Sequence, residues 1–142
     1  MPSNIKFYGP TNQFYILKRM MRYGMALTSA EFKVYCFIYD RTFSWSKDVE
    51  SIPYTHFIDG VVGSDGRRWA FGVGMAEKAL QRAIKGLCDK GAIRRARPGN
   101  PWLGTCYWHN LEWEAPGIEK LPLPEKLQPD AAEILARRWQ IK

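Results

Sequence analysis

The sequence predicts a mainly α-helical domain with a small β-component, of the α+β class. Apolar residues recur at helical spacing in several segments. Short runs rich in β-branched and aromatic residues lie between turn residues around positions 50–71 and 92–113. The chain has 142 residues, of which 46% are hydrophobic and 14% aromatic. That is enough for one domain of ordinary size with its own core.

Two helices are expected near the N-terminus. Residues 1–11 are predicted to form a loosely held arm, and residues 13–23 a short helix ended by Gly24. The face predicted to point inward carries Phe14, Leu17 and Met21. The face predicted to point outward carries Lys18, Arg19 and Arg22.

The second helix has a strong start signal. Thr28 and Glu31 have the spacing of a capping box. The segment that follows, to about Tyr39, is apolar almost all round, which is typical of a helix buried from several sides. We expect it to be the core helix, or to face another subunit in part.

The next elements are predicted to be short. Residues 50–52 can form a strand, and Pro53 favours the first turn of a helix over residues 54–59, with Phe57 and Ile58 inward. A β-hairpin is expected to follow, because a turn signal lies between two apolar runs. This hairpin pattern comprises Val61, Val62, Asp65, Gly66, Trp69 and Phe71, with Arg67 and Arg68 beside the turn.

The segment from Gly72 to Arg97 combines an amphipathic helix with a basic strand. Its apolar residues recur at intervals of three and four, which places them on one helix face: Ala76, Ala79, Leu80, Ala83, Ile84, Leu87 and Cys88. The other face is polar and mostly basic: Glu77, Lys78, Gln81, Arg82 and Lys85. Gly91 has the position of a C-cap glycine. A helix of this kind, followed by a basic strand and a turn at residues 98–101, is the outline of a recognition helix and a wing.

The order of the predicted elements indicates a particular fold. Residues 105–113 are strand-like by their content, so the order is helix, helix, strand, helix, hairpin, helix, strand, wing, strand. This is the order of a winged helix-turn-helix with a hairpin inserted before the recognition helix. The predicted domain covers residues 1–115, followed by a Pro-rich linker at 116–129 and a C-terminal helix at 130–142.

Positive charge is concentrated on the segment that contains this helix and wing. The formal net charge is +7 and the sequence pI is near 9.5. Residues 51–110 hold 9 basic and 4 acidic side chains, whereas residues 111–142 hold 5 and 6. Such a distribution is typical of a surface that binds a polyanion. Basic helix faces are also often only solvated, so the prediction depends on the whole set of side chains.

Two motifs are shared with a known group of proteins. The first is the run Arg41-Thr42-Phe43-Ser44-Trp45, and the second extends from Ala83 to Ile93. They resemble the N-terminal domain of phage replication protein O and related winged-helix initiators, which show Arg-Thr-aromatic-Gly-Trp and Ala-Ile-Lys-x-Leu-x-x-x-Gly-hydrophobic-Ile. The resemblance covers Phe14 to Arg97, with departures at Ser44 and at Ala76, where a Ser or Thr cap is usual. It implies binding to a duplex replication origin and, in larger members, recruitment of the replicative helicase by a C-terminal segment.

The predicted mode of binding follows from the helix. Its N-terminal turns are expected to lie deepest in the major groove, with Lys78, Gln81 and Arg82 at base edges. The predicted phosphate or wing contacts are Arg67, Arg68, Lys85, Arg94, Arg95 and Arg97. Trp102, at the predicted wing tip, could pack on sugar or wedge a groove, although cover for the core is the more usual role.

The sequence allows three alternatives to a replication initiator. A stand-alone winged-helix transcriptional regulator would use the same helix. A protein-interaction winged helix, or a homodimer, would use aromatic residues in excess of what a small core must hold: Tyr35, Phe37, Trp108, Trp113 and Trp139. An enzyme is the weakest alternative. The pairings of His56 with Asp59 and of His109 with Glu112 come with no nucleophile motif or phosphate loop.

The cysteines and the apolar runs predict a cytoplasmic protein. The resemblance to phage initiators implies, further, a bacterial cell and association with the nucleoid. Cys36, Cys88 and Cys106 are far apart and lie in apolar patterns, as expected of buried, reduced thiols. We expect no zinc site and no cofactor. The polar N-terminus predicts no signal peptide, and no apolar run approaches the length of a membrane span.

Overall fold

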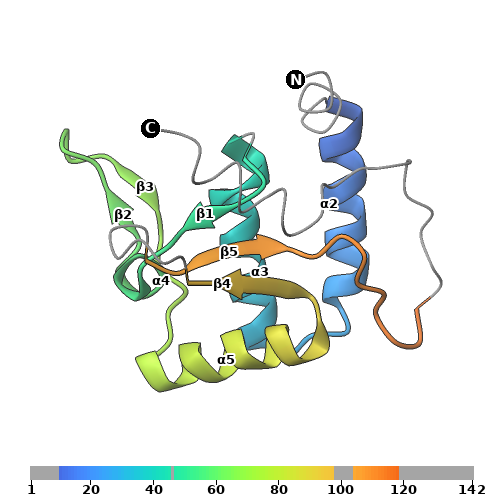
Figure 1. Ribbon diagram of the computed structural model, residues 1–142. Helices are drawn as coiled ribbons and strands as arrows, with labels where there is room; N and C mark the ends of the chain where they lie inside the picture. The colour runs from blue at the N-terminus through green and yellow to red at the C-terminus, as the bar shows by residue number, and fades with distance from the viewer. Residues whose placement is uncertain (1–9, 46, 98–103, 119–142) are drawn as a thin grey trace.

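The computed structural model describes residues 10–45, 47–97 and 104–118, which form a mixed α/β fold with two small antiparallel sheets (Figure 1). The elements follow in the order α2 (Pro10–Gly24), α3 (Ser29–Arg41), the 3-10 helix η1 (Phe43–Trp45), β1 (Glu50–Ser51), α4 (Tyr54–Asp59), β2 (Val61–Val62), β3 (Arg68–Ala70), α5 (Glu77–Lys90), β4 (Ile93–Ala96) and β5 (Cys106–His109). This is the predicted order of helices and strands. The predicted turn at 98–101, Trp102, and nearly all of the predicted linker and C-terminal helix lie outside the described residues.

Helix α3 begins with the predicted capping box. The Thr28 hydroxyl accepts a hydrogen bond from the Glu31 N–H at 3.2 Å, and the Thr28 N–H donates to the Glu31 carboxylate at 3.0 Å. Glu31 also accepts a hydrogen bond from the ammonium group of Lys90, near the end of α5. Burial opposes ionisation of Glu31, but the hydrogen bonds from Lys90 and Thr28 outweigh it and lower the pKa of the carboxyl group. One side chain therefore caps α3 and ties it to α5.

Helix α5 packs on α3 with the face that its periodicity predicts. Leu80, Ala83, Ile84 and Leu87 are buried, and together with residues of α3 they form the centre of the core. The helix ends at Gly91, whose φ of 85° lies in the left-handed region that favours glycine. The N-cap residue is alanine, with no side-chain hydrogen bond, as the sequence indicates.

The three-stranded sheet has the order β1-β5-β4, so the last described strand lies in the centre (Figure 1). All four residues of β5 are buried. Alternation along a strand places Tyr107 and His109 on the same face, and that face packs on the helices. The Tyr107 ring lies 5.4 Å from the ring of Phe57 in α4, and the His109 ring lies 4.2 Å from that of Tyr35 in α3.

Helix α2 begins at Pro10 rather than Gln13 and buries a different face from the predicted one. Ile16, Met20 and Tyr23 are buried, whereas Leu17 and Met21 are exposed. These two stripes both have helical spacing, so the local pattern could not decide between them. The side chain of Phe14 lies outside the described part of the structure.

Arg19 was predicted to face solvent but is only 2% exposed. Its guanidinium group donates a hydrogen bond to the Trp113 carbonyl oxygen and lies 4.4 Å from the centre of the Tyr23 ring. Burial lowers the pKa of Arg19. The segment after β5 thus closes over α2 through this arginine, an interaction between residues 94 positions apart in the sequence.

The predicted hairpin is present, and its base is joined closely to α4. A Cβ atom on Gly60 would lie 2.1 Å from the Ala70 carbonyl oxygen, and one on Gly72 would lie 1.9 Å from that of Ile58. The Val73 N–H donates to the Phe57 carbonyl oxygen at 2.7 Å. Backbone approach of this kind is possible only without side chains. The hairpin therefore projects from the body of the molecule on a fixed base (Figure 1).

The cysteines are less buried than expected. Cys106 is buried as predicted, but Cys36 and Cys88 are half-buried. Burial raises the pKa of both half-buried thiols, which favours their protonated form. Across residues 10–45, 47–97 and 104–118, the structure contains no helix with the length and apolar character of a membrane span.

Candidate nucleic-acid interface

The outward face of α5 collects the predicted base-contacting side chains. Lys78, Gln81, Arg82 and Lys85 are all exposed, on the side of the helix opposite the face buried against α3. Gln81 donates a hydrogen bond of 3.3 Å to Glu77, one helical turn earlier. Among the described residues, Lys78 and Arg82 form no ion pair. Their long side chains are therefore available to a ligand.

Lys85 already has an acidic neighbour on the same face. Its ammonium group lies 2.7 Å from the Asp89 carboxylate, one turn further along α5. Both side chains are well exposed, and such pairs contribute only about 0.3–0.5 kcal/mol. A phosphate group could therefore displace Asp89 from Lys85 at little cost.

The arginines of β4 do not lie in one row. In the register of β4 and β5, Arg94 pairs with Trp108 and Arg95 with Tyr107. Because neighbouring strand residues point to opposite faces of a sheet, the two arginines lie on different faces. Burial raises the pKa of Tyr107 to about 12, and the hydrogen bond from Arg95 works against that rise. Arg95 lines a hollow with Tyr54 and Tyr107. Arg94 and Arg97 are exposed, and Arg95 is the one of the three that is engaged by a described side chain.

Arg67 and Arg68 belong to a separate surface. They lie on the projecting hairpin, well apart from α5 (Figure 1). The Arg67 guanidinium group lies 3.6 Å from the Asp65 carboxylate, and Arg68 donates a 3.0 Å hydrogen bond to the Asp59 carbonyl oxygen. The structure therefore brings four of the nine predicted contact residues together on α5 and places these two elsewhere.

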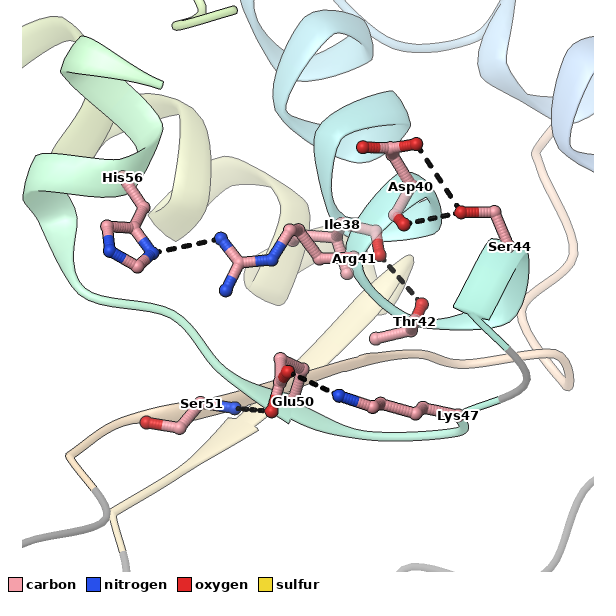
Figure 2. A network of polar contacts seen from close by, with 9 residues as sticks. All are labelled: Ile38, Asp40, Arg41, Thr42, Ser44, Lys47, Glu50, Ser51 and His56. Atoms are coloured by element: carbon pink, nitrogen blue, oxygen red, sulfur yellow. Dashed lines mark hydrogen bonds and ion pairs between the residues drawn. The ribbon is translucent and has the colours of Figure 1, made fainter. Parts of the chain in front are cut away.

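Both histidines have structural roles in the core or beside it. His109 is buried, its Nε2 atom lies 2.9 Å from the Tyr35 carbonyl oxygen, and burial lowers its pKa to about 3. His56 contacts Arg41, not Asp59: the Arg41 guanidinium group donates to its Nδ1 atom at 3.0 Å (Figure 2). Burial and the charge of Arg41 lower the pKa of His56. Both rings are therefore neutral at pH 7.

The aromatic residues expected at a protein interface are instead in the core. Tyr35, Phe37, Trp108 and Trp113 are all buried, and Trp139 lies outside the described residues. Tyr35 packs against the rings of both His109 and Trp113. Four of the five rings predicted for a subunit interface are therefore used to build the core.

The sequence prediction missed the aromatic residues that are exposed. Trp45 of η1, Trp69 of β3 and Phe71 are 57%, 56% and 80% exposed. The Trp45 and Trp69 ring centres lie 6.2 Å apart at an angle of 68°. A signal was present, since Trp69 and Phe71 are two residues apart and so lie on one face of a two-stranded hairpin. The part of the chain that the structure describes contains no cluster of three or more potential metal ligands.

Comparison of the chain with known protein families, curated proteins and solved structures found no match. The resemblance to phage replication initiators therefore depends on the two sequence motifs alone.

Proposed function

We propose that the protein binds double-stranded DNA sequence-specifically through α5, as a winged helix-turn-helix protein, in the role of a phage or plasmid-type replication initiator. The observation that carries this proposal is the outward face of α5. One face of the helix is buried on α3, and the opposite face presents Lys78, Gln81 and Arg82. An exposed basic helix supported from behind is what major-groove reading requires.

The order of the elements supports the winged-helix assignment. The chain runs through α3, β1, α4, the β2–β3 hairpin, α5, β4 and β5. In the sheet order β1-β5-β4, the edge strand β4 directly follows α5 and contacts it. In this assignment β4 and β5 flank the wing. Arg94 and Arg97 then supply phosphate contacts from the base of the wing, and Lys85 supplies one from α5.

The first test is a titration of duplex DNA at increasing salt concentration. Binding through phosphates predicts a linear fall of log K with log [salt], with a slope of about −0.9 for each neutralised phosphate. The measurement is fluorescence anisotropy with labelled duplexes from a random-sequence pool. Failure to bind any duplex at low salt would refute the proposal.

Selection of bound duplexes from that pool separates the replication role from that of a transcriptional regulator. An initiator is expected to select a site that recurs in tandem at an origin. A dimeric regulator is expected to select a palindromic site, because its two-fold symmetry is mirrored in the DNA.

A further inference from the structure

A pocket lies where the hairpin meets the end of α3. Trp45 of η1 and Trp69 of β3 form its aromatic walls, and its volume is about 180 Å³. Its polar wall consists of Asp40, Arg41, Lys47 and Glu50, which Figure 2 shows at the C-terminal end of α3 and along the segment that follows it. The pocket is smaller than the roughly 300–1,000 Å³ of sites that enclose a drug-sized ligand. It has room for one small planar group.

The two tryptophans present flat apolar surface to solvent. Each is more than half exposed, although their rings contact one another. The Trp69 indole is held over the hairpin backbone, since a Cβ atom on Gly63 would lie 2.4 Å from its Nε1 atom. Because the base of the hairpin is fixed against α4, the Trp69 ring is already positioned before a ligand binds. A planar ligand could stack on it without ordering the protein further.

The polar wall offers both donors and acceptors. Arg41 has five N–H donors and directs one of them to the neutral His56 ring, so its positive charge is not cancelled there (Figure 2). The exposed Asp40 carboxylate accepts a hydrogen bond of 3.4 Å from the Ser44 hydroxyl. Lys47 lies 2.9 Å from Glu50. Arg41 and Asp40 are therefore placed to hydrogen-bond the edge of a ligand stacked on the tryptophans.

The surroundings of the pocket favour an anionic chain. Arg67 and Arg68 lie on the same hairpin as Trp69 and are exposed, and the Arg68 guanidinium group lies 5.4 Å from the centre of the Phe71 ring. Aromatic rings with adjacent arginines are the combination that binds single-stranded nucleic acid, because every base has a π-face and every linkage a phosphate.

We propose that this pocket binds an unpaired base of single-stranded DNA. The base stacks on the face of Trp69 and meets the Trp45 ring, which is inclined at 68° to it, at an angle. Its polar edge contacts Arg41 and Asp40, and the adjoining phosphates lie along Arg67 and Arg68. Paired bases are excluded, since their edges are already hydrogen-bonded and their faces stacked. This site is separate from the duplex surface of α5 and does not depend on it.

The test measures binding of the full-length chain to a labelled oligothymidine by fluorescence anisotropy at low salt. Trp69→Leu is expected to weaken this binding at least tenfold, and Trp69→Phe, which keeps an aromatic face, is expected to retain most of it. Arg82→Ala, on α5, is the matched control and should leave single-strand affinity unchanged. Because Trp69 is more than half exposed, the thermal midpoint of Trp69→Leu should stay close to that of the wild type.

Two results would overturn the proposal. One is no binding of oligothymidine by the wild-type chain at low salt, and the other is equal affinity for the wild-type chain and Trp69→Leu. If sedimentation shows a dimer that Trp69→Leu dissociates while single-strand affinity is unchanged, the tryptophans form a self-association surface instead. Failure of duplex binding alone would refute the role of α5 and leave this site intact.

Discussion

At the scale of single residues, the charged side chain of Glu31 joins two helices. Its carboxylate caps α3 and accepts a hydrogen bond from Lys90, which belongs to the neighbouring helix. Arg19 is the corresponding case among cations: it is buried, it is hydrogen-bonded to the Trp113 carbonyl oxygen, and it connects α2 to the segment after β5. Glu31 and Arg19 thus each connect two segments that are distant in the sequence.

Glu31→Gln is expected to lower the free energy of unfolding by about 1–2 kcal/mol at pH 7, because a hydrogen-bonded and largely buried charge is lost. The pKa of Glu31 in the folded protein lies below its ordinary value. Its contribution is therefore present above the ordinary glutamate pKa and is lost as the pH falls through the lowered value. Urea unfolding at pH 7 and at pH 3 measures this difference.

The control for this prediction is Glu112→Gln, which removes an exposed carboxylate. It should change the unfolding free energy little at either pH. A stability gap between wild type and Glu31→Gln that is as large at pH 3 as at pH 7 would contradict the assigned role of the charge.

At the scale of elements, α5 combines two tasks on two faces. Its buried face builds the core with α3, so the substitutions that test its proposed function must be confined to the outer face. The hairpin resembles α5 in this respect, because its base is fixed by close backbone contact and its exposed side chains are left for binding.

Arg82→Ala and Lys85→Ala are expected to differ in their effects on duplex binding. A base contact by Arg82 carries about 1–3 kcal/mol of discrimination, so its loss should relax the preference for the selected site. A phosphate contact by Lys85 should weaken all duplexes alike when it is lost. Competition between selected and random duplexes checks both, and equal, sequence-independent losses would refute the assignment of Arg82 to base reading.

Gly72→Ala tests the fixed base of the hairpin. The added Cβ atom would meet the Ile58 carbonyl oxygen at 1.9 Å, and that oxygen belongs to the backbone. We expect the hairpin to move and the free energy of unfolding to fall by about 1–3 kcal/mol. Ser64→Ala, at the exposed tip of the same hairpin, is the control and should be neutral in urea unfolding. A fully stable Gly72→Ala protein would contradict the close approach.

At the scale of the whole molecule, the fold separates two basic regions. The outer face of α5 lies on one side of the body, and the hairpin with Arg67 and Arg68 projects elsewhere (Figure 1). The exposed basic side chains of the described residues are therefore divided between at least two surfaces. This separation is why duplex binding and single-strand binding are proposed for different elements and can be tested by different variants.

The sequence by itself determined the order of the elements and some of their ends, such as the start of α3 and the end of α5. The capping box at Thr28, the glycine at the end of α5 and the turn at Asp65-Gly66 each act over a few residues, so local hydrogen bonding and backbone geometry suffice to predict them. The outward face of α5 could also be predicted from local sequence, because the helix carries a single apolar stripe.

Only the tertiary structure decided which of two possible faces is buried and which charges share a surface. Helix α2 carries two apolar stripes, and packing against residues distant in the sequence selected the one with Ile16 and buried Arg19. Most aromatic residues of α3 and β5 are buried in the core, whereas Trp69 is 56% exposed on the projecting hairpin. The physical reason is that burial depends on the surface that an element meets, and that surface comes from elsewhere in the chain.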